Sequence, residues 1–238
     1  FAELLINDEI LVDSGPLAIA QAQFPYGLWW VKDRSSANNH QLVSHVYNGV
    51  VTCPGNSTYQ SDFATYVPPA TDSVVWAWGT DSTGLNLEAG FEIIQKVGTA
   101  QVDAFNHRLG KEPKFIMVWA DRNDLALTAY HVSTGASYRQ TMSNNTQFFS
   151  NNTWWGGNQS NFNASTFGVG NTSYTNSNEN NNGGNVYFLW TDIPGYSAFG
   201  KYTANNNADG PMVYLGFKPA MVWLKRTTGS GGWTVNAS

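Results

Sequence analysis

The sequence predicts an all-β protein made of antiparallel β-sandwich modules in tandem, of the jelly-roll or lectin-like kind, with little helix. Two observations carry this prediction. Short apolar and aromatic runs recur between clusters of Gly, Asn, Ser and Thr, and only 12% of the 238 residues are charged. Proteins typically carry about 25% charged residues, and exposed helical faces depend on them. Such a composition argues strongly against a helical scaffold.

Seven runs have the length and composition of strands, since they are rich in β-branched and aromatic side chains and are bounded by turn formers. They occupy residues 28–31, 74–78, 91–94, 114–119, 185–190, 212–215 and 221–224. Several of them are apolar throughout, which predicts strands that are covered on both faces.

A repeat is visible in the order of these runs. Pro25, Pro113 and Pro219 each lead into an apolar strand that contains Trp and is followed by basic residues. The run at 74–78 also resembles the run at 186–190. A Gly-containing turn follows each of the two, and a further strand is then expected to begin with Phe, at Phe91 and at Phe199.

The repeat predicts how the chain is divided. Residues 1–23 are an N-terminal segment connecting from a preceding part, and 24–90 form a first, shorter β module. A complete module follows at 91–197, with an Asn-rich insertion at 143–184 that we expect to be ordered and to contain a strand or two. Residues 198–238 begin a third, truncated repeat, so the chain is expected to be a fragment of a longer polypeptide.

Charge and cysteine content exclude several classes of protein. The formal net charge of −5 and the pI near 5.2 leave no basic patch for nucleic acid or an anionic membrane. No apolar stretch reaches the 18 residues of a membrane-spanning helix. The single cysteine, Cys53, rules out an intramolecular disulfide framework and is interpreted as an idle thiol.

No pattern of catalytic or metal-binding residues stands out, so we expect no catalytic residue, no metal site, no cofactor and no enzymatic activity. The four histidines have neither Cys partners nor the spacing of a zinc site. A glycosidase uses two carboxylates, and two pairs of acids lie close together in the sequence, Glu88 with Glu92 and Asp121 with Asp124. Ala89-Gly90 is expected to interrupt any strand that would put Glu88 and Glu92 on one side, and Asp121 with Asp124 is interpreted as a turn after a strand.

The best candidate for ligand binding lies in the Asn-rich insertion. Trp154 and Trp155 stand next to each other in a loop that also contains Asn152 and Asn158. An exposed indole can stack on a sugar ring while Asn side chains bond its hydroxyls. Local packing of the two tryptophans is the alternative, because large aromatic side chains are usually buried.

Three stretches resemble an uncharacterised repeat domain family found in long virion structural proteins, of the tail-fibre type, in marine tailed phages including cyanophages. They are residues 27–42 (GLWWVKDRSSANNHQL), 192–202 (DIPGYSAFGKY) and 208–222 (ADGPMVYLGFKPAMV). Residues 1–23 and 143–184 match the family less well. The resemblance brings no catalytic residues with it.

The resemblance implies a virion structural protein, localised in the particle and assembled in the host cytoplasm. The leading expectation is a tail-fibre or appendage segment that contributes to host adsorption by binding a surface glycan, with 143–184 facing outward. Its partners would be other virion proteins and further copies of itself, a trimer being favoured. The alternatives are a capsid decoration protein, a non-viral cell-surface adhesin and a polysaccharide-degrading enzyme.

Overall fold

The computed structural model confirms that the protein is all-β. It describes residues 5–6, 9–10, 23–33, 40–53, 73–121, 127–142, 149–150, 153–180, 183–229 and 231–237. Besides the helical residue Gln23, helical structure in the described residues is limited to the 3-10 turn η1 (Gln159–Asn161) and the single turn α2 (Ser173–Asn176). Near the N-terminus, β1 (Leu5–Ile6) pairs with β2 (Glu9–Ile10). No helix in the described residues is long and apolar enough to cross a membrane.

Seven antiparallel strands form the larger sheet, in the spatial order β13-β12-β11-β10-β15-β8-β7. They are β7 (Leu85–Asn86), β8 (Phe91–Lys96), β10 (Phe115–Trp119), β11 (Thr128–His131), β12 (Tyr138–Thr141), β13 (Phe149–Ser150) and β15 (Asn185–Trp190). Every residue of β10 and β15 is buried. The prediction that continuously apolar runs are covered on both faces is therefore confirmed for these two strands.

A second antiparallel sheet has four strands in the order β5-β4-β3-β6. They are β3 (Gly27–Asp33), β4 (His40–Ser44), β5 (Tyr47–Cys53) and β6 (Ser73–Gly79). In β3, side chains alternate between the two faces of the sheet, and the first five residues are all buried.

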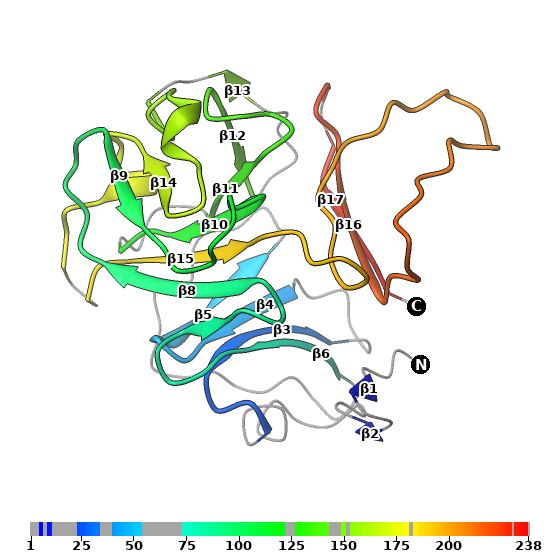
Figure 1. The fold of residues 1–238 in the computed structure, drawn as a ribbon, viewed down its shortest axis with the longest axis horizontal. Coiled ribbons are helices and arrows are strands. Elements are labelled where there is room, and N and C mark those ends of the chain that lie inside the picture. The colour runs from blue at the N-terminus through cyan, green and yellow to red at the C-terminus, as the bar shows by residue number, and fades with distance from the viewer. Residues whose placement is uncertain are drawn as a thin grey trace.

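The two sheets face each other across one aromatic core, as a sandwich does. Figure 1 shows β3 and β6 beneath β8 and β15. Leu28 and Trp30 from the smaller sheet pack in the same buried cluster as Phe115, Phe188 and Trp190 from the larger one. All three predicted segments, 24–90, 91–197 and 198–238, contribute side chains to this cluster.

The opposite face of the larger sheet is covered by a third layer. Strands β9 (Asp103–Asn106) and β14 (Thr166–Val169) pair with each other there, on the side away from β3 and β6 (Figure 1). Their Phe105 and Phe167 pack with Tyr187 of β15, at ring-centroid distances of 5.8 and 5.2 Å. This layer explains why β10 and β15 are buried on both sides.

The Asn-rich insertion 143–184 is ordered in its described part and contains β13 and β14, as expected. Asn176 is completely buried and acts as its anchor. Its Nδ2 donates to the carbonyl of Gln101 at 2.6 Å and to that of Gly170 at 3.0 Å, while its Oδ1 accepts from the amide of Thr99 at 2.8 Å. The insertion is thereby fastened to the turn that follows β8.

The C-terminal residues form a hairpin, β16 (Met221–Lys225) with β17 (Trp233–Ala237). Trp223 lies against Trp30 and Trp78 of the smaller sheet, at ring-centroid distances of 4.6 and 5.7 Å. The hairpin closes one end of the aromatic core. It also repeats the pairing of β3 with β4 and of β10 with β11.

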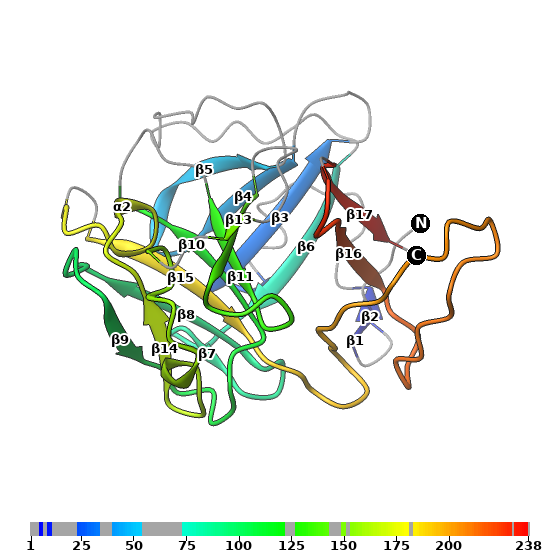
Figure 2. The ribbon, with the colours of Figure 1, turned by 90° about the horizontal axis from the view of Figure 1, so that it is seen from above.

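Between β15 and this hairpin lies a long extended segment, residues 198–220, which we call the arm. Figures 1 and 2 both show it projecting beyond the body of the protein. The predicted strands at 212–215 and at Phe199 are wrong, because the arm contains no strand. A strand requires a neighbour to accept and donate its backbone hydrogen bonds, and none lies beside the arm in the described part of the chain.

Candidate functional site

The structure places Trp155 inside the protein and not on a sugar-binding surface. Its side chain is completely buried. The indole packs edge-on against Tyr130 and Phe162, at ring-centroid distances of 5.6 and 6.4 Å. The surface role expected for this residue is therefore not borne out, since no face of the ring is free to stack on a ligand.

Trp154 is also buried, with 4% of its surface exposed. One face stacks on Tyr174, at a ring-centroid distance of 4.2 Å and an interplanar angle of 19°. The guanidinium of Arg139 lies 3.5 Å from the ring centroid. Tyr174 and Arg139 therefore occupy the ring surface on which a sugar would have to stack.

The two asparagines predicted beside them have different outcomes. Asn158 is the N-cap of η1, where its Oδ1 accepts from the amide of Ser160 at 3.1 Å and from its hydroxyl at 2.8 Å. This is a structural turn. Asn152 lies outside the described residues.

The acid pairs do not form a glycosidase site in the described residues. Glu92 is 1% exposed. Its Oε1 accepts from Arg108 Nε at 2.6 Å, and its Oε2 accepts from the Arg108 amide at 2.7 Å. Glu88 is exposed, and Asp121, which is buried, accepts from the amide of Gly184 at 3.2 Å. Asp124 lies outside the described residues.

The four histidines have hydrogen bonds typical of structural residues. Nδ1 of His40 accepts from the indole of Trp30, and Nδ1 of His45 accepts from the amide of Gly27. His131 ends β11 of the larger sheet, and His107 directly follows β9 of the covering layer. Burial lowers the pKa of each below its usual value. No cluster of three metal-ligating side chains occurs in the described ranges.

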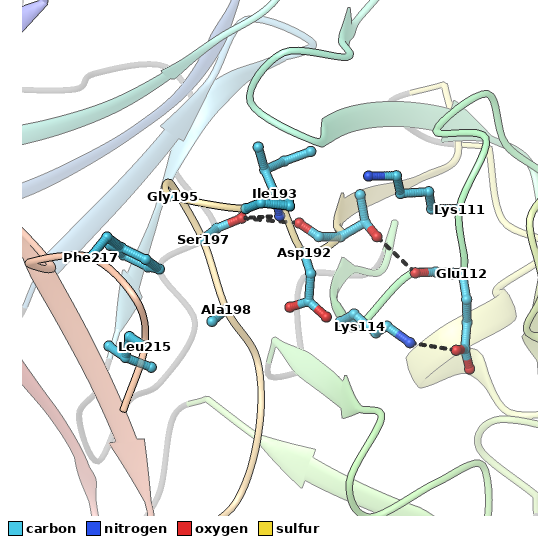
Figure 3. Close-up of a pocket in the computed structure, with 12 residues that line it drawn as sticks. Lys111, Glu112, Lys114, Asp192, Ile193, Gly195, Ser197, Ala198, Leu215 and Phe217 are labelled. Atoms are coloured by element: carbon cyan, nitrogen blue, oxygen red, sulfur yellow. Dashed lines mark hydrogen bonds and ion pairs between the residues drawn. The ribbon is translucent and has the colours of Figure 1, made fainter. Parts of the chain in front are cut away.

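A cavity of about 520 Å³ lies where the arm leaves the body. Figure 3 shows Lys111 and Glu112 on one side of it, Asp192 and Ser197 in the middle, and Phe217 of the arm on the other. Lys114 Nζ donates to Glu112 Oε2 at 2.6 Å, and Asp192 Oδ1 accepts from the amide of Phe199 at 2.8 Å. Lys111 is exposed at the rim. The sequence analysis missed this cavity, because its walls come from three separate turns.

The arm is the most exposed apolar segment among the described residues. The exposed fraction is 87% for Met212 and 84% for Tyr214, while Val213 and Tyr202 are each 51% exposed. Single exposed apolar side chains are ordinary, but a continuous group on an extended segment marks an interaction surface. The apolar run at 212–215 carries this signal in the sequence, where its pattern predicts a strand.

Comparison with known proteins gives one match. The sequence pattern of a family described as a domain of unknown function, DUF7483, matches residues 70–238. The matched region begins just before β6 and includes the whole of the larger sheet, the arm and the C-terminal hairpin. No curated protein matches the chain, and no solved structure does.

Proposed function

We propose that this chain, which belongs to the DUF7483 family, is a non-enzymatic structural protein of a phage virion and forms a segment of a tail fibre or another appendage. The observation that carries the proposal is the arm, with its exposed Met212, Val213 and Tyr214. Apolar side chains presented on an extended segment are what a subunit needs to bind its neighbours in an assembly.

The resemblance of residues 27–42, 192–202 and 208–222 to repeat domains of virion proteins supports the setting within a phage particle. The described side chains support a role without catalysis. Both carboxylate oxygens of Glu92 accept hydrogen bonds from Arg108, so the acid is engaged by the protein and does not face a substrate.

Contribution to host adsorption is the second part of the proposal. Since Trp154 and Trp155 are buried, we assign glycan binding to the cavity between the arm and the body. Lys111 at its rim offers hydrogen-bond donors and a positive charge, and Phe217 offers a ring for stacking. A surface polysaccharide, with hydroxyls to bond and ring faces to stack, matches this combination of groups.

Mass spectrometry of purified particles, combined with cryo-electron microscopy, tests the structural role. We expect the chain in the virion, at a few to tens of copies in a projecting appendage. A copy on every capsomer would instead support the alternative function, capsid decoration. Absence from purified particles would contradict the virion assignment altogether.

Host-cell binding by the purified protein tests the adsorption role. Lys111→Glu reverses the charge at the cavity rim and is expected to lower binding at least tenfold. Lys218→Glu makes the same change at an exposed arm residue that does not line the cavity, and it should bind as the parent does. Equal binding by both variants would remove the cavity from the proposal.

A further inference from the structure

Strand β6 has an open edge in the described part of the chain. It pairs with β3 on one side only and ends the four-stranded sheet. Its counterpart in the larger sheet is β15, whose run 186–190 resembles the run 74–78 of β6. Strand β15 pairs with β10 on one side and with β8 on the other. Every residue of β15 is buried, whereas Val75 is the one fully buried residue described in β6.

The hydrogen bonds of β6 define which of its groups face outward. The amide of Thr80 donates to the carbonyl of Tyr26, and antiparallel pairs alternate between bonded and non-bonded positions. The backbone groups of Val75 and Ala77 therefore point away from β3. The carbonyl of Gly79 points the same way and accepts from Asn86 Nδ2 at 2.8 Å. The open stretch consequently lies before Gly79.

The arm contains the strand that this edge lacks. In the larger sheet, β8 begins at Phe91 after a Gly-containing turn and pairs along β15, with Phe91 opposite Trp190. Phe199 follows a Gly-containing turn in the same way, and its ring stacks on Phe115 at 6.1 Å. Residues 200–204, which come next, are exposed and have no strand partner in the described residues.

We propose that residues 200–204 of one copy of this chain add as an antiparallel strand to the open edge of β6 in a second copy. The inference rests on the proposed structural function, whose partner it names. Strand addition to a free sheet edge supplies main-chain hydrogen bonds and satisfies backbone groups of both partners. Reciprocal exchange would produce a two-fold dimer, and one-way addition would produce a ring or a chain.

The register follows from β8 and β15. If Trp78 takes the place of Trp190, then Gly200 lies opposite Ala77 and Tyr202 lies opposite Val75. Both are positions where the β6 backbone points outward. Tyr202 next to Val75 is a favourable aromatic and β-branched pair. It extends the buried cluster of Trp29, Val31, Val43 and Val75 on that face of the sheet.

A second copy suits this edge better than the arm of the same chain. Phe199 is held against Phe115 of the larger sheet, whereas β6 belongs to the smaller one. From Phe199 the arm runs outward, as both views show (Figures 1 and 2). The exposed side chains of the arm are accordingly presented to a neighbour.

Mixing two single-cysteine variants tests the contact. In a Cys53→Ser background, one population carries Ala77→Cys and the other carries Gly200→Cys. Gly200 has open space around its Cβ position. We expect mild oxidation to give a covalent heterodimer in the mixture. Ala208→Cys, also exposed on the arm, replaces Gly200→Cys as the matched control and should give at least tenfold less product.

Two outcomes would overturn the inference: equal cross-linking by the Gly200 and Ala208 variants, or a chain with both cysteines that closes on itself at high dilution. The protein in purified form suffices for this test. Its failure is therefore distinct from absence of the chain in virions, which would contradict the proposed function.

Light scattering tests the strand pairing independently of cysteines. Tyr202→Pro removes the amide that would bond to Val75, and Tyr202 is half exposed, so the monomer should fold normally. We expect the dissociation constant of self-association to rise about tenfold or more, as loss of about 1.4 kcal/mol requires. Ala208→Pro is the control, and equal association of both variants with the parent would refute the pairing.

Discussion

The indole Nε1 of Trp30 donates a hydrogen bond of 2.7 Å to Nδ1 of His40, linking neighbouring strands β3 and β4. Because Nδ1 is the acceptor, the folded protein needs the neutral imidazole. Burial, reinforced by the charge of Lys32, lowers the pKa of His40 to about 4.

This bond predicts a loss of stability in mild acid. The unfolded chain takes up the proton near pH 6.5, but the folded chain does so only near pH 4. The unfolded state therefore binds more protons between these values, and the free energy of unfolding falls as the pH falls from 6.5 towards 4. The lowered pKa values of His107 and His131 act in the same direction.

Urea unfolding at pH 7 and pH 5 measures this effect. His40→Gln keeps an acceptor for Trp30 and cannot be protonated. We expect it to reduce the stability difference between the two pH values by on the order of 1 kcal/mol, after discounting for the partly solvated ring. An unchanged difference would show that His40 does not contribute to the acid sensitivity.

Because the carboxylate of Glu92 is buried, we expect removal of Arg108 alone to destabilise the protein more than removal of both charges. Arg108→Ala leaves a carboxylate that is 1% exposed without its guanidinium partner, and we expect the free energy of unfolding to fall by roughly 3 kcal/mol. Adding Glu92→Gln to Arg108→Ala removes the uncompensated charge and should restore part of the loss. Chemical denaturation of Arg108→Ala, Glu92→Gln and the double variant measures both effects, with the exposed Lys111→Ala as the control. Additive losses would contradict this reading.

Because Trp155 is buried in the core, we expect Trp155→Ala to destabilise the fold and not to cause a specific loss of binding. Trp155→Ala removes a fully buried indole from contact with Tyr130 and Phe162. The expected loss is about 3–5 kcal/mol in the free energy of unfolding. Tyr214→Ala truncates an aromatic residue that is 84% exposed and should leave the melting temperature unchanged. A stable Trp155→Ala protein would show that the indole is not part of the core.

Because Asn176 anchors the Asn-rich insertion, we expect its replacement to destabilise the protein. Asn176→Ala removes the donors to Gln101 and Gly170 and the acceptor for Thr99. We expect a loss of roughly 3 kcal/mol, since buried backbone groups are left unpaired. Asn176→Asp should be equally harmful, because a carboxylate would face two carbonyls.

Hydrogen exchange locates the consequence of the Asn176 substitutions. Amides of β14 and of the turn at 98–101 should lose protection before those of β10 and β15. Asn178→Ala, an exposed neighbour, is the control. Uniform loss of protection throughout the protein would contradict a local anchor.

Much of the fold was predictable from local pattern. Six of the seven predicted runs lie in strands, among them 28–31 in β3 and 185–190 in β15. Period, β-branched content and flanking turn residues are properties of neighbours in sequence, so they can be read without knowing what packs on what. The apolar character of β10 also predicted that both of its faces are covered.

The candidate site could not be predicted in this way. The sequence left both surface recognition and local packing open for Trp154 and Trp155. The structure decides for packing, because Tyr174, Arg139 and Tyr130 come from other elements to cover them. Conversely, the apolar run 212–215 predicted a strand, but it forms none and Met212, Val213 and Tyr214 are exposed. Burial depends on which distant segments arrive at a residue, and a strand depends on a partner for its hydrogen bonds. Composition therefore determined that this protein is built from aromatic β-strands, whereas the arrangement of the sheets decided which aromatic residues form the core and which face a neighbour.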